Sequence, residues 1–153
     1  MKIMEKENVY DIKFRYYKCD DYFEIKCYKN KKKLGNLTFK VTGKYYDEVF
    51  VYNIETTSTL NKGVGSSLID ALEYFVYLND IETFDAKFYP KNEYAKDFYE
   101  HRGYEIYKDG YETYIFKDYK KTKIKKDVLP KIISIDPVEK DKLDLRNINN
   151  MEL

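Results

Sequence analysis

The most informative stretch of this 153-residue sequence is Leu60-Asn61-Lys62-Gly63-Val64-Gly65-Ser66-Ser67-Leu68. It follows residues 48–56, which alternate as in a β-strand, and it precedes apolar residues spaced three and four apart, as on one face of a helix. Glycines at such a turn let the backbone approach an anion closely, and the amides of the first helical turn then point at that anion. The stretch therefore predicts a pyrophosphate site, to which Lys62 adds a positive charge.

Two other phosphate-binding motifs do not fit this stretch. A P-loop requires the pattern G-x-x-x-x-G-K-[ST], and that spacing is absent. A dinucleotide-binding fold places its glycine turn after the first strand of a β-α-β unit. Here the turn follows a fourth predicted strand, after those at 9–17, 22–28 and 34–42. A tight helix start that binds nothing stays open as an alternative.

The remaining pattern predicts an α/β (α+β) fold with a mostly antiparallel mixed sheet, a central β-α-β step and two main helices. The first helix begins at Gly63 and ends at Asp80, and a strand follows at 84–89. A second helix is expected at 92–102, with Asn92 as its N-cap and Gly103 as its stop. Two short strands at 104–107 and 112–116 complete the pattern. The strand–helix–strand step should place two strands parallel.

The composition argues against several classes of protein. His101, Cys19 and Cys27 are too few for a structural zinc site, which takes about four ligands, so we expect no metal. No apolar run approaches the roughly 20 residues that span a bilayer, and residues 1–6 lack the apolar core of a signal peptide. We therefore expect a cytoplasmic protein without membrane contact. A net charge of +1 does not favour nucleic acid as a partner.

The character of the chain changes after residue 118. Residues 117–126 are rich in lysine, an apolar stretch follows at 128–135, and residues 136–153 are mainly polar. We predict a domain at 1–118 and an appendage at 119–153, of which 128–135 docks on the body or on a partner and the extreme end is mobile. The lysine-rich stretch is expected to be a solvated face, with nucleic-acid contact as the alternative.

Two motifs resemble those of the GNAT superfamily of N-acetyltransferases. The first family motif is Arg/Gln-x-x-Gly-x-Gly/Ala, and residues 60–65 match it at both glycines, although Leu60 stands at the Arg/Gln position. The second runs from Asn92 through Ala95 and the Phe98-Tyr99 pair to Gly103-Tyr104. The motifs occur in the family's order, with a helix and a strand between them. The resemblance covers residues 48–116.

The resemblance implies acetyl-CoA as co-substrate and a role for each matching residue. In the family the pantetheine arm lies where two strands splay apart, and a tyrosine protonates the leaving thiolate. Tyr99 occupies that tyrosine's position, although a tyrosine on a helix face is often simply core. The implied cofactor-binding residues are Ile54 and Thr56 beside the pantetheine, Asn61, Lys62, Gly63, Val64, Gly65 and Ser66 around the pyrophosphate, and Asn92, which could equally be only a helix cap.

The implied acceptor is an amine, on a small molecule or on a protein lysine or N-terminus. A carboxylate must remove the proton of that amine, and Glu55 and Glu48 are the candidates, although strand glutamates are usually only solvated. The family inserts two helices between its first two strands, whereas here only residues 18–21 separate them. The acceptor pocket is then open, unusually built, or completed by the appendage or by a second subunit of a homodimer. The alternative function is a non-catalytic module that acts through its lysine-rich tail.

Overall fold

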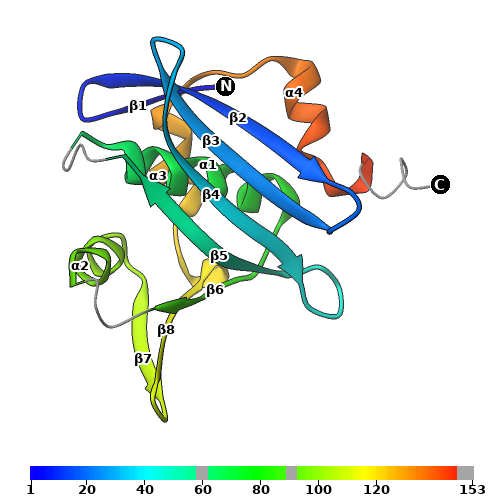
Figure 1. The fold of residues 1–153 in the computed structure, drawn as a ribbon. Coiled ribbons are helices and arrows are strands. Elements are labelled where there is room, and N and C mark those ends of the chain that lie inside the picture. Colours follow the sequence, from blue (N-terminus) through cyan, green and yellow to red (C-terminus); the bar gives the residue numbers. More distant parts are fainter. Residues whose placement is uncertain (58–61, 89–92, 148–153) are drawn as a thin grey trace.

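The computed structural model describes residues 1–57, 62–88 and 93–147, and it contains one mixed sheet (Figure 1). The sheet order is β7-β8-β6-β5-β4-β3-β2-β1-β9. The elements are β1 (Lys2–Glu5), β2 (Asn8–Tyr17), β3 (Tyr22–Lys29), β4 (Lys32–Thr42), β5 (Glu48–Thr56), α1 (Val64–Asn79), β6 (Thr83–Phe88), α2 (Glu93–His101), β7 (Glu105–Asp109), β8 (Glu112–Asp118), η1 (Tyr119–Lys121), α3 (Ile124–Val128), η2 (Leu129–Lys131), β9 (Ile132–Ser134) and α4 (Pro137–Lys142).

The predicted fold class is confirmed. All described strand pairs are antiparallel except β5 with β6, which α1 connects. One expectation is wrong: the turn before α1 follows the fifth strand and not the fourth, because β1 precedes the others. Strand β1 has four residues, too few to give a clear alternation, but its Ile3 side chain is fully buried.

Helix α1 packs against one face of the sheet and forms the centre of the core. Its Leu68, Ile69 and Leu72 are completely buried, as the spacing of three and four residues requires. The Phe75 ring lies 5.1 Å from that of Phe39 on β4 and 5.2 Å from that of Phe23 on β3, measured between ring centroids. The helix and these strands therefore share one aromatic core.

The segment after residue 118 folds onto the body as far as the structure describes it. Strand β9 pairs with β1, so residues 132–134 of the stretch 128–135 extend the sheet. Val128 of α3 is completely buried, and α3 lies against α1. Lys117, expected on a solvated face, is 5% exposed because its ammonium donates to the Arg102 carbonyl oxygen at 3.0 Å. Residues 148–153 lie outside the described part of the chain.

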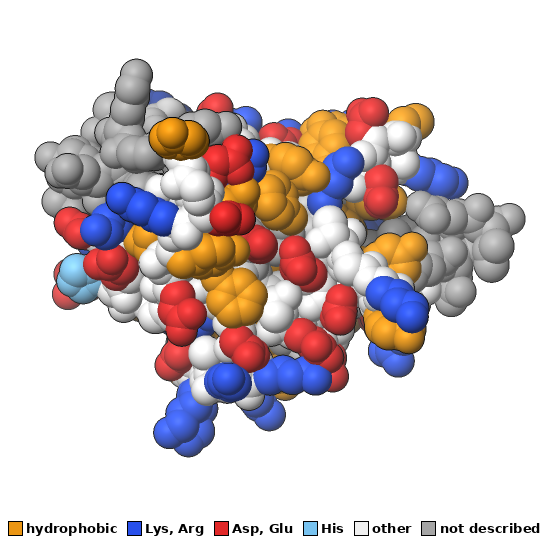
Figure 2. All heavy atoms as spheres, turned by 90° about the horizontal axis from the view of Figure 1, so that it is seen from below, with side chains coloured by type: hydrophobic (Ala, Val, Ile, Leu, Met, Phe, Trp, Pro, Cys, Tyr) orange, Lys and Arg blue, Asp and Glu red, His pale blue; other side chains and the backbone are white. Residues whose placement is uncertain are grey.

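In the part of the sheet formed by β5, β6 and β8, the helices cover one face and leave the other uncovered by any described helix. Val49, Phe84 and Ile115 point to the face that the helices cover and are buried. Their neighbours in sequence point to the opposite face, because successive side chains of a strand alternate. No helix of the described residues covers that second face, here called the open face. It is the face seen from below in Figure 2.

Candidate active site

The sheet opens between β5 and β6. These two strands pair from Glu48 opposite Thr83 to Val51 opposite Ala86, and the pairing stops there. Each strand continues with its other neighbour, β5 with β4 as far as Thr56. At the same point the register of β5 against β4 shifts, so Tyr52 has no partner and forms a bulge. No described residue pairs with the β6-side edge of β5 beyond the bulge, so this edge can pair with an extended ligand.

The chain turns into α1 at Gly63, which is fixed in a left-handed conformation with φ of 85°. A Cβ atom there would lie 2.8 Å from the Cβ of Glu5 in β1, so glycine is required both by the backbone and by the contact. The hydroxyl of Tyr10 donates to the Lys62 carbonyl oxygen, and the Ser67 amide donates to the Gly63 carbonyl oxygen at 2.9 Å. Strands β1 and β2 thus hold the turn in place.

The N-terminus of α1 lacks a cap. No side chain caps it, its first turn contains no acidic residue, and no described residue accepts a hydrogen bond from the amides of Val64, Gly65 or Ser66. A Cβ on Gly65 would meet only the Phe98 ring of α2, at an ordinary 3.7 Å. Packing therefore does not require glycine at this position, whereas close approach of an anion to the backbone would.

The predicted cofactor-binding residues fall on these two features. Ile54 and Thr56 lie on the part of β5 beyond its pairing with β6, and Lys62 to Ser66 form the turn and the start of α1. The Val64 side chain is buried in the core, so only its backbone is available to a ligand. Asn61 and Asn92, also predicted, lie outside the described residues.

Tyr99 belongs to the core at the junction of α2 with the sheet. Its side chain is 3% exposed and its ring contacts those of Phe98, Tyr104 and Phe84, with centroids 5.2, 5.4 and 6.2 Å away. Burial raises the pKa of its phenol, which therefore stays protonated at neutral pH. A protonated phenol can donate, and the adjacent Phe98 lies beside Gly65, so Tyr99 remains near the predicted cofactor site.

The open face carries an acidic and aromatic patch that the sequence analysis did not predict. One row across four strands consists of Glu105, Phe116, Asp85 and Phe50. Tyr107 and Tyr114 stack in the next row, with centroids 5.4 Å apart. Figure 2 shows acidic and hydrophobic side chains interspersed across the middle of this face. Adjacency across strands creates the patch, so no local sequence pattern indicates it.

Asp85 is the most unusual member of this patch. Its Oδ1 is buried and has no hydrogen-bond partner among the described residues, and burial raises the pKa of its carboxyl. Burial also raises the pKa of Glu48, and the charge of Asp85 raises it further. Glu55 differs: it is exposed, and its carboxylate accepts a hydrogen bond from the Asn53 amide at 2.8 Å. The raised pKa values make Glu48 and Asp85 candidates for removing a proton.

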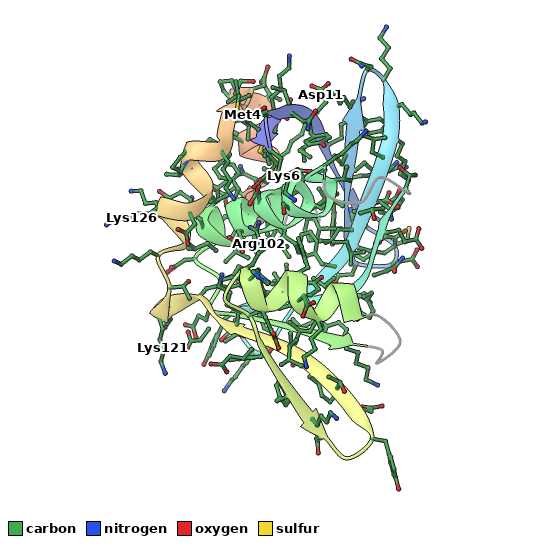
Figure 3. The ribbon with its side chains drawn as sticks, turned by 90° about the vertical axis from the view of Figure 1, so that its left-hand side faces the viewer. Met4, Lys6, Asp11, Arg102, Lys121 and Lys126 are labelled. Atoms are coloured by element: carbon green, nitrogen blue, oxygen red, sulfur yellow. The ribbon has the colours of Figure 1, made fainter. Side chains whose placement is uncertain are left out.

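A buried ionic cluster joins the helices behind the site. Arg102, at the end of α2, lies between α1 and α2 in Figure 3, with its guanidinium 2.6 Å from the Asp70 carboxylate of α1. Lys131 reaches the same carboxylate at 3.4 Å and that of Glu5 on β1 at 2.6 Å. Lys121 and Lys126, by contrast, lie at the outer edge of the C-terminal segment (Figure 3). The cluster ties the end of α2 to α1, to β1 and to η2.

No family model and no curated protein sequence matches this chain. Solved structures do match. The PaiA N-acetyltransferase of Thermoplasma acidophilum, in complex with coenzyme A, is 16% identical with a TM-score of 0.58, over 65% of this chain and 62% of that one. A GNAT-family acetyltransferase of Staphylococcus aureus is 13% identical with a TM-score of 0.59, over 67% and 70% of the two chains. This chain has the GNAT fold.

A third GNAT-fold match is similar in extent. The N-acetyltransferase PseH of Campylobacter jejuni, in complex with acetyl coenzyme A, is 16% identical with a TM-score of 0.53, over 64% of this chain and 68% of that one. Among the described residues of this chain, no group of His, Cys, Asp and Glu side chains is arranged to hold a metal ion, and none of the helices has the length and apolar character of a membrane span.

Proposed function

We propose that this chain is an N-acetyltransferase that moves an acetyl group from acetyl-CoA to an amine by direct attack. One observation carries the proposal: the open edge of β5 leads, through the Gly63 turn, to an uncapped helix N-terminus at which packing does not require Gly65. An extended amide chain that ends in a pyrophosphate matches this arrangement. The coenzyme A complexes of the GNAT-fold neighbours support the same ligand.

The reaction needs a base and an acid. The amine nitrogen bonds to the thioester carbonyl carbon, the carbon–sulfur bond breaks, and the amine loses a proton. Asp85 or Glu48 accepts that proton, since burial gives each a raised pKa, and Glu55 is the alternative base. Tyr99 gives its phenol proton to the departing thiolate sulfur. Burial raises the pKa of this phenol, so the proton is present at neutral pH.

The open face favours an acceptor that arrives as a cation. Asp85 supplies a negative charge between Phe50 and Phe116. Burial, and after it the nearby charge of Asp85, raises the pKa of Tyr107. Aromatic faces and a carboxylate together attract an ammonium group. Because no described helix covers this face, it also leaves room for a large acceptor such as a lysine side chain of a protein.

Calorimetric titration of acetyl-CoA into three proteins tests the proposal. The wild type should bind at micromolar strength, about −8 kcal/mol. Gly65→Asp should not bind, because its carboxylate would face the pyrophosphate. An acidic residue in the first helical turn stabilises a helix, so this variant should stay folded. Gly65→Ala is the uncharged comparison. Its Cβ meets only an ordinary contact within the protein, so it should stay folded and bind more weakly than the wild type but more tightly than Gly65→Asp, because it adds bulk at the backbone without a negative charge.

Two outcomes would contradict the proposal. Equal binding by Gly65→Asp and the wild type would place the pyrophosphate elsewhere. A folded wild type that binds no acetyl-CoA would exclude the transferase, and the non-catalytic alternative, acting through the lysine-rich segment, would take its place.

A further inference from the structure

The C-terminal end of α2 forms a tight helix stop that includes Tyr99. The amides of Arg102 and Tyr104 both donate to the Tyr99 carbonyl oxygen, at 3.1 and 3.0 Å. Gly103 has a φ of 84°, the left-handed conformation in which helices commonly end. The Tyr99 and Tyr104 rings pack against each other, with centroids 5.4 Å apart. The position of Tyr99 therefore depends on what holds Arg102 and Tyr104.

Buried polar contacts join this helix end to α1. Asp70 and Glu73 lie three residues apart on α1, on the same side of the helix, and both are buried. The Arg102 guanidinium lies 2.6 Å from the Asp70 carboxylate. The Tyr104 hydroxyl donates to the Glu73 carboxylate at 2.8 Å, and the Lys117 ammonium lies 3.6 Å from that carboxylate. Breaking a buried ion pair leaves one charge uncompensated, so these contacts hold α2 in one position on α1.

The described part of α2 has few other buried side chains. Over residues 95–101 only Tyr99 is buried, Ala95 and Phe98 are partly buried, and the rest are exposed. The Phe98 ring lies beside Gly65, in the first turn of α1. Arg102 is therefore the charged anchor of a helix that lies against the proposed cofactor site.

The Tyr99 hydroxyl is available to a ligand. Its side chain is almost completely buried, and the hydroxyl forms no hydrogen bond with any described residue. Burial raises the pKa of the phenol, and the positive charge of Arg102 opposes that effect. A cation that acts on the phenol oxygen without bonding it stabilises the phenolate and leaves the hydroxyl able to donate.

We infer that Arg102 is a positioning residue for the proposed acetyl transfer. It holds Tyr99 on α1 through Asp70, and its charge stabilises the phenolate that remains when Tyr99 gives its proton to the thiolate sulfur of coenzyme A. The phenolate then regains a proton from water. A fixed cation near a developing negative charge lowers the barrier most where water is excluded, as at this buried tyrosine. The inference rests on the proposed function.

A double-mutant cycle on the full chain tests this role. The kcat is measured at saturating acetyl-CoA, with spermidine and a lysine-containing peptide as acceptors, so that a change in cofactor affinity does not enter. Arg102→Gln should lower kcat about 10- to 100-fold, as expected when a catalytic group is misplaced. In the Tyr99→Phe background the same substitution should change kcat less than about twofold, because the hydroxyl on which Arg102 acts is absent. Arg102→Lys, which keeps a cation beside Asp70, should recover most of the loss.

Two further variants separate positioning from a loss of stability. Leu143→Ala removes a buried side chain in the segment after α4, so it should destabilise the fold and yet keep kcat within about twofold. Asp70→Asn/Arg102→Gln removes both charges of the pair and leaves no buried ion uncompensated, so it should fold and lose kcat as Arg102→Gln does.

The outcomes distinguish this inference from the proposed function. An active wild type in which Arg102→Gln costs the same with and without Tyr99, or in which Arg102→Lys loses as much as Arg102→Gln, overturns the inference alone. A wild type that acetylates neither acceptor overturns the proposed function and the inference with it.

Discussion

Glu48, Asp85 and Glu55 are three carboxylates with different surroundings. Glu55 lies beyond the Tyr52 bulge, exposed to solvent and hydrogen-bonded to Asn53. Asp85 is flanked across the strands by Phe50 and Phe116, and its Oδ1 is buried without a partner in the described chain. Burial raises the pKa of Asp85, which makes its carboxylate a better base, so the environment of Asp85 suits proton removal.

We expect Asp85→Asn to lower the acetylation rate about 100-fold, the usual loss on removing a general base. Spermidine and a lysine-containing peptide serve as acceptors, with acetyl-CoA binding measured in parallel and expected to be unchanged. Product should be measured by chromatography, because the exposed thiol of Cys19 reacts with reagents that detect free coenzyme A. The wild-type rate should rise with pH through a pKa above the ordinary aspartate value, and this rise should disappear in the variant.

The matched control for this prediction is Glu55→Gln, which should keep the rate within about twofold. If Glu55→Gln instead abolishes activity while Asp85→Asn does not, Glu55 is the base and the assignment of Asp85 is wrong.

The C-terminal elements are held on the body by a few specific contacts. The Asn79 amide at the end of α1 donates to the Leu143 carbonyl oxygen at 2.9 Å, and its carbonyl oxygen accepts from the Leu145 amide at 2.8 Å. The Leu143 side chain is 4% exposed, whereas Val138 on α4 is 62% exposed. Helix α4 alone is too short to be stable, so its position depends on these anchors.

Leu143→Ala should lower the free energy of unfolding by about 2–4 kcal/mol, since it removes a buried side chain and leaves a cavity. Val138→Ala, on the same segment, should change it by less than about 0.5 kcal/mol. Urea denaturation measures both. An equal effect of the two substitutions would mean that the segment after α3 is not anchored through Leu143.

Across the whole molecule, the buried ionic cluster links Glu5 of β1, Asp70 of α1, Arg102 beyond α2 and Lys131 of η2. The Asp70 side chain is completely buried, and burial together with its contact to Glu5 raises the pKa of its carboxyl from 3.8 to about 7, against the opposing charges of Arg102 and Lys131. Against the effect of burial, the hydrogen bonds of Glu5 with Asp70 and with Lys131 keep the pKa of Glu5 below its usual value. The folded chain therefore holds a proton on Asp70 that the unfolded chain releases.

The sign of the pH dependence follows from that proton. Between pH 5 and pH 7 the folded state binds more protons at Asp70 than the unfolded state does, so the free energy of unfolding should fall as pH rises, by at most about 1.4 kcal/mol per pH unit. Asp70→Asn should flatten this slope, and the exposed Asp20→Asn should not. Urea denaturation at pH 5, 6 and 7 measures it. An unchanged slope in Asp70→Asn would show that Asp70 is ionised throughout.

Local periodicity was enough to predict most of the elements and their order. Alternation predicted the strands from β2 to β8, spacing of three and four residues predicted α1, and Gly63 and Gly65 indicated the turn where the candidate cofactor site lies. These features depend on neighbours within a few residues of one another, so a single sequence contains them. Strand β1 escaped prediction because its four residues are too short for a period.

Tertiary structure alone decided what lies on each face. Asp85 becomes a candidate base only when β6 pairs with β5 and β8, and the ionic cluster forms only when α2 and the C-terminal segment meet α1. Each brings together side chains that are far apart in sequence. Their pairing depends on strand register and on burial, which the periodicity of any one segment does not specify.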